Sequence, residues 1–338
     1  MPRQSTPSKR VTIADVAREA GVSRSTVSFV LNKTPGQTIP ETTRQRVIAA
    51  ARKLSYQPSA TARALRRGRS DIILFLMPNW STGEAVAQAM DAISVALAEH
   101  GLTYLLHPRA TSNRHLSDLW RSVTPALVIT VDDLDDDDSA ALDAAGIAHM
   151  TFGLGDDSRT PHSYQEMIGR IQAEHLIQTG HTRLGYATVP DTSLFTFAES
   201  RLRGVQQVCA GYGLPSPLAL GAQPGTEAER SLRAWRSAEV TAVAAYNDEV
   251  ALALLQAARA SGVTVPEDLA VIGADDIAAA GLSCPPLTTV RIDPSAFVPA
   301  LVSTIMAHLN RTPPENAPTI PDGELVLRDS TNVTKKRR

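Results

Sequence analysis

A short stretch of the chain, residues 23–32, carries side chains of the kinds that read the edges of DNA bases. If the stretch is helical, Val27, Val30 and Leu31 form its buried side. The outward side then carries Arg24, Ser25, Ser28, Phe29 and Asn32. An arginine can donate two hydrogen bonds to a guanine, whereas a phenylalanine makes only apolar contacts, for example with a thymine methyl group. The chemistry of this side is that of sequence-specific contact with DNA.

Two neighbouring helices would position that side. One apolar face is formed at helical spacing by Ile13, Val16, Ala17 and Ala20. Gly21 follows where a tight turn between helices needs an unrestricted backbone, and Ser23 is a good N-cap for the second helix. A third helix is expected after a capping-box pattern, Thr38-x-x-Glu41, with its inward residues at Val47, Ala50, Ala51 and Leu54. Two short helices joined by a glycine turn are typical of a helix-turn-helix, whose second helix enters the major groove.

The charge of the chain is divided sharply along its length. Its 338 residues carry a net charge of −2, but residues 1–70 hold 14 Lys and Arg against 3 Asp and Glu. This head therefore carries +11 and the remainder −13. A basic head is expected to meet a polyanion, which disfavours two simpler interpretations, a solubilising tail and a three-helix bundle without a DNA role.

Composition excludes several other classes of protein. Hydrophobic residues make up 43% of the chain, yet no stretch approaches the roughly 18 apolar residues of a membrane span. The first residues lack the apolar region of a secretory signal. The two cysteines, Cys209 and Cys284, support neither a disulfide framework nor a zinc site. We expect a cytoplasmic, nucleoid-associated protein without a membrane partner, a cofactor, a metal or a catalytic residue.

The remainder of the chain alternates short apolar runs with amphipathic helical stretches. Strands are expected near residues 71–78, 102–107, 125–132, 147–153, 183–189, 242–246 and 269–275. Helices are expected near residues 84–100, 138–145, 168–180, 200–213, 227–238 and 248–262. Repeated β-α units predict an α/β fold of parallel sheets covered by helices on both sides. Two such series in tandem predict two Rossmann-like lobes with a ligand cleft at the strand ends.

The head resembles the DNA-binding region of the LacI/GalR family of repressors in the runs TIADVAREAGVSRSTVSFVLN and TRQRVIAAARKLSYQPSATARALRRG. The resemblance implies base reading by Arg24 and Ser25, after the N-cap Ser23, and by Phe29, where the family usually has Arg or His. It also implies a hinge helix at residues 58–69 in which Leu65 wedges into the minor groove. Other hinge contacts with DNA are expected from Ser59, Ala62, Arg63 and Arg66.

The same resemblance continues in AEHLIQTGHTRLGYA, RLRGVQQ, AYNDEVALALLQAARASGVTVPEDLAVIGADD and CPPLTTVRID. It implies a two-lobed effector domain similar to periplasmic sugar-binding proteins, with effector contacts at Trp80, Arg201, Asn247 and Asp275. The expected domains are a helix-turn-helix at 10–57, the hinge at 58–69, an effector-binding and dimerisation domain at 70–330 and a basic tail at 331–338. Within the effector domain, lobe one takes about 70–162 and 291–321, and lobe two about 163–290 and 322–330.

Several positions leave the nature of the effector open. Gly153, Gln223 and Ile292 replace the acidic, aromatic and polar residues of the family's sugar-binding pattern. The effector is therefore a sugar-like molecule, another metabolite, or absent from a vestigial pocket. A simpler interpretation of the acidic residues is that Asp248 and Asp276 cap helices and that Asp275 is a loop acid.

The features together predict a repressor that binds a palindromic, double-stranded DNA operator as a homodimer under the control of a small-molecule effector. A sugar-binding transport receptor would share the body but not the +11 head. An enzyme on this fold would need a catalytic constellation, and no Ser-His-Asp, P-loop or zinc spacing is present. The acidic run Asp132, Asp133 and Asp135–Asp138 lacks the Gly and spaced Glu of a calcium loop, and is expected to cap a helix or to be solvated.

Overall fold

The structure of the chain, a computed structural model, describes residues 11–32, 36, 38–56, 69–77, 84–108, 117–130, 134–151, 161–189, 195–291, 293, 298–313 and 323–332. Contacts between residues divide the chain into two compact units, residues 1–71 and residues 72–338. Some expected site residues lie outside the described residues, namely Ser59, Ala62, Arg63, Leu65, Arg66 and Trp80. The same is true of Gly153 and Ile292.

The first unit is built from three short helices, α1 (Ile13–Ala20), α2 (Arg24–Leu31) and α3 (Glu41–Lys53). Their fully buried centre is formed by Val16, Val27 and Val47, one from each helix. Gly21 ends α1 with φ 64°, a conformation that glycine adopts without steric cost. The Ser23 side chain caps α2 by accepting a hydrogen bond from the Thr26 N–H at 3.1 Å. The helix-turn-helix expectation is therefore confirmed at its turn and its cap.

The expected capping box at the start of α3 is wrong. The helix begins at Glu41 with Pro40 as its N-cap residue, so Thr38 lies outside it. A proline lacks an N–H and has a restricted φ, and both properties suit the residue at which a helix begins. A capping box is found instead at the start of α1. There the Asp15 carboxylate accepts hydrogen bonds from the Thr12 N–H at 2.9 Å and from the Thr12 hydroxyl at 2.7 Å.

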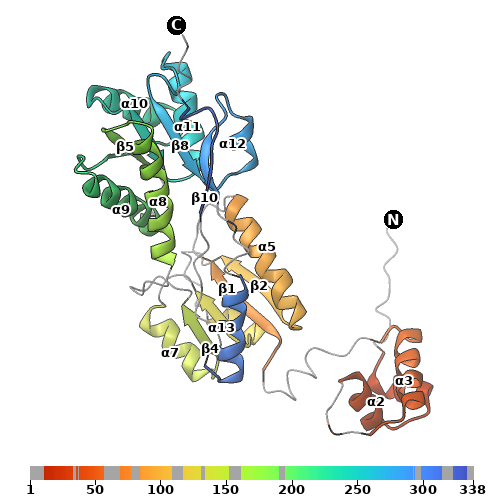
Figure 1. Cartoon of the computed structure of the whole chain (residues 1–338). Helices are drawn as coiled ribbons and strands as arrows, with labels where there is room; N and C mark the ends of the chain where they lie inside the picture. Colours follow the sequence, from red (N-terminus) through yellow and green to blue (C-terminus); the bar gives the residue numbers. More distant parts are fainter. Residues whose placement is uncertain are drawn as a thin grey trace, which may run out of the picture. The chain divides into compact units, whose positions relative to one another are not determined.

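The second unit contains two sheets. The first is parallel, in the order β2-β1-β3-β4, and comprises β1 (Ile72–Met77), β2 (Thr103–Pro108), β3 (Leu127–Thr130) and β4 (Ala148–Thr151). Alternate residues of β1 point to opposite faces. Ile73 and Phe75 pack in a cluster with α5 (Glu84–Glu99) and α13 (Val298–Asn310), whereas Leu74 and Leu76 pack with residues of α6 (Ser117–Val123) and α7 (Asp136–Ala144). This sheet and its four helices are called lobe one (Figure 1).

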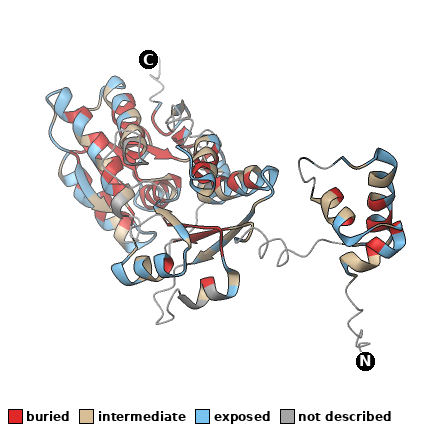
Figure 2. Cartoon of the chain, turned by 90° about the horizontal axis from the view of Figure 1, so that it is seen from below, coloured by how far each residue is buried: buried red, intermediate tan, exposed pale blue. Residues whose placement is uncertain are grey.

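The second sheet has the order β10-β9-β8-β7-β5-β6, in which only β10 runs antiparallel to its neighbour. Its strands are β5 (Leu184–Thr188), β6 (Leu218–Gly221), β7 (Ala242–Ala245), β8 (Ala270–Ala274), β9 (Thr288–Arg291) and β10 (Glu324–Val326). Its helices are α8 (Pro161–Gln178), α9 (Phe195–Gly211), α10 (Thr226–Ser237), α11 (Asp248–Ala260) and α12 (Ala278–Leu282). β7 and β8 are buried throughout, as central parallel strands covered on both faces should be (Figure 2). This sheet and its helices are called lobe two.

The chain passes between the two lobes three times. It passes after β4, again between β9 and α13, and finally between α13 and β10. The carboxyl ends of the parallel strands in lobe two therefore lie beside segments that lead to lobe one. Among the helices of the described residues, none is long and apolar enough to cross a membrane.

Candidate DNA-reading face and effector site

The start of α2 presents an exposed polar face. Ser23, Arg24 and Ser25 are all exposed. The Ser23 hydroxyl oxygen lies 2.7 Å from that of Ser25 and 2.8 Å from that of Thr26, so the hydroxyls form one chain around the helix terminus. The residues that the sequence places first on a recognition helix are thus accessible and locally ordered.

Two further residues, Phe29 in α2 and Asn32 directly after the helix, differ in what they offer to DNA. Phe29 is half-buried, yet among the described residues it lies outside the apolar cluster centred on Val16, Val27 and Val47. Its ring is therefore not required for the core. The Asn32 amide, in contrast, donates to the Ser28 carbonyl at 2.5 Å and the Ser28 hydroxyl at 3.1 Å. Asn32 closes the end of α2 in this structure.

In lobe two, the guanidinium of Arg201 in α9 is buried among polar partners. Its Nε donates to Gln165 Oε1 at 2.5 Å, its Nη1 donates to the Tyr246 carbonyl, and its Nη2 lies 3.3 Å from Asp275 Oδ1. The guanidinium carbon also lies 4.5 Å from the centre of the Tyr246 ring. Burial alone lowers the pKa of Arg201, but the charge of Asp275 and the nearby tyrosines hold it above its usual value. Arg201 is therefore a buried cation paired with Asp275.

The sequence did not indicate the residues that surround this pair. Gln165 and Tyr164 lie near the start of α8, and Tyr246 ends the β7 run. Tyr164 is largely buried, and burial raises the pKa of its hydroxyl while the charge of Arg201 opposes the rise. The only indication in the sequence that Tyr246 lies at this site was its position next to Asn247. For Gln165 and Tyr164 the sequence held no such indication.

Two glycines bring Gln165 and Arg201 together. A Cβ atom on Gly169 of α8 would overlap the Arg201 carbonyl, and one on Gly204 of α9 would overlap the Glu166 carbonyl. The two helices therefore touch through their backbones at reciprocal positions. This close contact between the helices brings the Arg201 side chain of α9 within hydrogen-bond distance of Gln165 on α8.

Asp275 follows β8 in an uncommon backbone conformation. Its φ is 101° and that of Asp276 is 50°, a region that L-residues other than glycine rarely adopt. The Asp275 N–H donates to the Val290 carbonyl at 2.9 Å, and its side chain is 20% exposed, against 6% for Arg201. Such conformations persist where the surroundings over-determine them, and they cluster at functional sites. Asp275 is thus the more accessible member of the pair.

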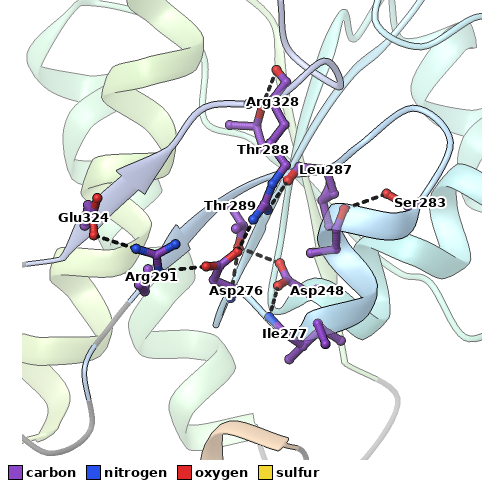
Figure 3. A network of polar contacts seen from close by, with 12 residues as sticks. Asp248, Asp276, Ile277, Ser283, Leu287, Thr288, Thr289, Arg291, Glu324 and Arg328 are labelled. Atoms are coloured by element: carbon purple, nitrogen blue, oxygen red, sulfur yellow. Dashed lines mark hydrogen bonds and ion pairs between the residues drawn. The ribbon is translucent and has the colours of Figure 1, made fainter.

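The interpretation of Asp248 and Asp276 as helix caps is wrong. Asn247 is the cap of α11, since its Oδ1 accepts from the Val250 N–H at 2.9 Å, and its Nδ2 donates to Glu249 at 3.2 Å. Asp276 instead pairs with Arg291 at 2.7 Å and Arg328 at 2.6 Å (Figure 3). The side chain of Asn247 therefore already has two protein partners in this structure.

Asp248 is fully buried beneath the same segment. Its Oδ1 accepts from the Thr289 hydroxyl at 2.6 Å and its Oδ2 from the Ile277 N–H at 2.9 Å. Burial raises the pKa of Asp248 to about 7, although these two hydrogen bonds act in the opposite direction. The polar groups at this edge of lobe two thus form one connected network.

Other candidate features have simpler explanations. Asp135 caps α7 by accepting from the Asp138 N–H at 2.7 Å, as expected for the acidic run. Gln223 is exposed, and its N–H donates to the Glu227 carboxylate at 3.3 Å. Across the described part of the chain, no group of three His, Cys, Asp or Glu side chains is arranged to hold a metal ion.

Comparisons with known proteins agree with both units. Residues 12–59 match the family model for bacterial regulatory proteins of the lacI family, and residues 173–331 match the model for a periplasmic-binding-protein-like domain. The regulator MalR of Streptomyces coelicolor is 31% identical over 340 residues, covering 94% of this chain and 96% of MalR.

Two solved structures have a similar fold. The Lac repressor dimer bound to operator and the anti-inducer ONPF matches with a TM-score of 0.77 at 24% identity, covering 96% of this chain and 99% of the repressor chain. The complex of the transcriptional regulator CelR with cellobiose matches with a TM-score of 0.64 at 26% identity, covering 95% and 100%. The chain therefore belongs to the LacI family of DNA-binding transcriptional regulators, with a helix-turn-helix head and a two-lobed effector domain.

Proposed function

We propose that this regulator represses transcription by binding a near-palindromic operator as a homodimer, and that a small molecule bound near Asp275 controls that binding. The observation that carries the proposal is the exposed start of α2 on a head of charge +11. A single helix-turn-helix offers a small interface, and two-fold pairing doubles it. The related Lac repressor was solved as a dimer bound to its operator. For the present chain we propose a regulatory rather than an enzymatic role, and a location in the cytoplasm with the DNA.

We assign base reading chiefly to Arg24 and Phe29. Arg24 is exposed in the first turn of α2, where a guanidinium can donate two hydrogen bonds to guanine. Phe29 lies one turn later, outside the core, and offers only an apolar contact. Ser23, Ser25 and Ser28 supply hydroxyls beside them. The supporting contacts proposed for the hinge are Ser59, Ala62, Arg63, Leu65 and Arg66.

The effector site is proposed to centre on Asp275, with Arg201 behind it, Asn247 at its edge and Trp80 contributed by lobe one. Because Asp275 already compensates the charge of Arg201, an anionic ligand would have to displace Asp275 from a buried cation. Hydroxyl or amine donors can instead reach the partly exposed Asp275 carboxylate without breaking the pair. CelR, a relative with this fold, was solved with cellobiose, a polyhydroxylated ligand of that kind.

Selection of operators from random DNA tests the base-reading assignment. The Arg24→Ala variant should lose about 1–3 kcal/mol of specific binding and relax preference at one position of each half-site. The Phe29→Arg variant should select a different base at its own position. Arg18→Ala is the matched control, because Arg18 is exposed on α1 and pairs with Asp15 at 3.1 Å. Identical selected motifs for the wild type, Arg24→Ala and Phe29→Arg would show that the assignment is wrong.

A further inference from the structure

The segment Asp275–Ala278 is held by all four of its backbone N–H groups. They donate to four separate groups, namely the Val290 carbonyl at 2.9 Å, Thr289 Oγ1 at 3.4 Å, Asp248 Oδ2 at 2.9 Å and Glu84 Oε2 at 3.3 Å, in chain order. The first three acceptors belong to lobe two. The fourth, Glu84, is the first residue of α5 in lobe one. The segment that carries Asp275 therefore contacts both lobes.

The Asp276 side chain extends these connections. It is only 10% exposed, and its two oxygens pair separately with Arg291 and Arg328 (Figure 3). Arg291 also pairs with Glu324 at 3.0 Å, and the Arg328 Nη1 donates to the Leu287 carbonyl at 2.8 Å. A carboxylate held by two guanidiniums has a defined position, since both oxygens accept charge-assisted hydrogen bonds.

These partners lie where the chain passes between the lobes. Arg291 is the last residue of β9, directly before the passage to α13 in lobe one. Glu324 begins β10, the first element after the chain returns, and Arg328 follows two residues after that strand. Asp276 thus fastens together the two strands that lead to and from lobe one.

The backbone of the segment leaves little room for local adjustment. Asp275 and Asp276 both have positive φ, which their surroundings must enforce, and each N–H is engaged. A shift of Asp275 toward a ligand or away from Arg201 must therefore move its neighbours. The nearest neighbours are the Asp276 ion pairs and the contact from Ala278 to Glu84.

We propose that the segment Asp275–Ala278 couples ligand contact at Asp275 to the arrangement of the two lobes, with Asp276 as the positioning residue. The inference rests on the proposed function, because it takes Asp275 as the ligand contact. A ligand acts through the segment to the extent that it favours one arrangement of Asp276 and its arginines over another.

The distance between the lobes tests the coupling without a known effector. Spin labels are placed on Ser94→Cys in α5 and Gln256→Cys in α11, both exposed positions, in a full-length Cys284→Ser background. Pulsed electron paramagnetic resonance then gives the distribution of interlobe distances. The Asp276→Asn variant should broaden or displace this distribution. The control Glu239→Gln removes a carboxylate from an exposed ion pair with Arg183 in lobe two and should leave the distribution unchanged.

Operator binding by the same variants separates this inference from the proposed function. With a duplex selected by the wild-type protein, Asp276→Asn should change the dissociation constant by roughly fivefold or more, the lower end of usual allosteric coupling. An interlobe distribution that matches the control overturns the coupling. So does an altered distribution with unchanged operator affinity. Failure of the wild-type protein to select any DNA would instead overturn the proposed function.

A second variant covers the case in which Asp276→Asn does not fold. Arg291→Gln removes the ion pairs of Arg291 with Asp276 and with Glu324, and leaves the contact between Asp276 and Arg328 in place. A folded Arg291→Gln protein, verified by thermal unfolding, should also show an altered interlobe distribution. A wild-type distribution in this variant contradicts the role assigned to Asp276.

Discussion

The proposed DNA-reading face and the proposed effector site place polar groups in opposite settings. The side chains of Ser23, Arg24 and Ser25 at the start of α2 are exposed, and the hydrogen bonds of the Ser23 hydroxyl are to Ser25 and Thr26, two and three residues further along the chain. Arg201 and its partners are buried, and they join α8, α9 and the ends of β7 and β8. Buried polar groups must find partners within the protein. The face is thus accessible to DNA as it stands, whereas a ligand must join or replace an existing internal network.

The largest loss of unfolding free energy should follow from removing the Arg201 side chain. Arg201→Ala leaves Asp275, Gln165 and the Tyr246 carbonyl without their shared donor, and breaking a buried pair costs about 3–5 kcal/mol. All three tryptophans lie within residues 72–338, so tryptophan fluorescence during urea unfolding reports this unit alone. We expect its unfolding free energy to fall by that amount.

Arg203 provides the matched control, two residues further along α9. It is exposed and pairs with Glu166 at 3.0 Å, so Arg203→Ala should cost no more than about 1 kcal/mol. Equal losses from both substitutions would show that the network around Arg201 contributes no more than a surface ion pair.

Asp248 should make the stability of the second unit depend on pH. Burial raises its pKa to about 7 in the folded state, against about 3.9 in an unfolded chain. Between these values the folded protein holds a proton that the unfolded chain releases, so the unfolding free energy falls as pH rises. For one proton the slope reaches about 1.4 kcal/mol per pH unit.

The comparison of wild type with Asp248→Asn isolates that slope. Urea unfolding at several pH values between 4 and 7 gives the difference between the two proteins, in which the other carboxylates largely cancel. The stability of the wild type relative to Asp248→Asn should decline toward pH 7. A difference that is constant across this range would mean that Asp248 is ionised throughout.

The contact between α8 and α9 should be sensitive to a single methyl group. The Cβ of Gly169→Ala would overlap the Arg201 carbonyl, and overpacking of this kind costs about 1–3 kcal/mol. At Gly211, in the last turn of α9, an added Cβ would meet no atom within 4 Å apart from its chain neighbours and the backbone of its own helix. Gly211→Ala should therefore be neutral or slightly stabilising, and the same urea unfolding measurement compares the two. A neutral Gly169→Ala would place the helices further apart than the structure does.

The smallest expected effect concerns the first unit. Thr12→Ala removes a cap residue of α1 and should cost about 1 kcal/mol, whereas Thr38→Ala, which lies outside α3, should cost almost nothing. Circular dichroism follows the thermal unfolding of residues 1–71 prepared as a fragment, which divides from the rest of the chain as a compact unit. A larger loss of stability for Thr38→Ala than for Thr12→Ala would show that Thr38 caps α3 after all.

Local patterns were sufficient for the three helices of the first unit, apart from the start of α3, and for most of the strands. The periodicity of Val16, Val27 and Val47 predicts their burial, because amphipathic helices must face a core. The sequence patterns did not indicate β6, β9, β10, α6, α12 or α13. β10, for example, is three half-exposed or exposed residues, Glu324–Val326, that become a strand only by pairing with β9. Short edge strands of this kind carry little local signal.

The sequence by itself determined the helix α2, the Gly21 turn before it and its Ser23 cap, and it singled out Arg201 and Asp275 as candidate site residues. The helix, turn and cap depend on spacing along a short stretch of chain, whereas Arg201 and Asp275 were implied by the resemblance to the LacI/GalR family. Only the tertiary structure decided that Asp275 pairs with Arg201, that Asn247 rather than Asp248 caps α11, and that Asp276 joins two strands. In the ion pairs of Asp275 and Asp276, the two partners are separated by 15 to 74 residues along the chain. Such contacts depend on how the sheet brings its strand ends together, and no local periodicity records that arrangement.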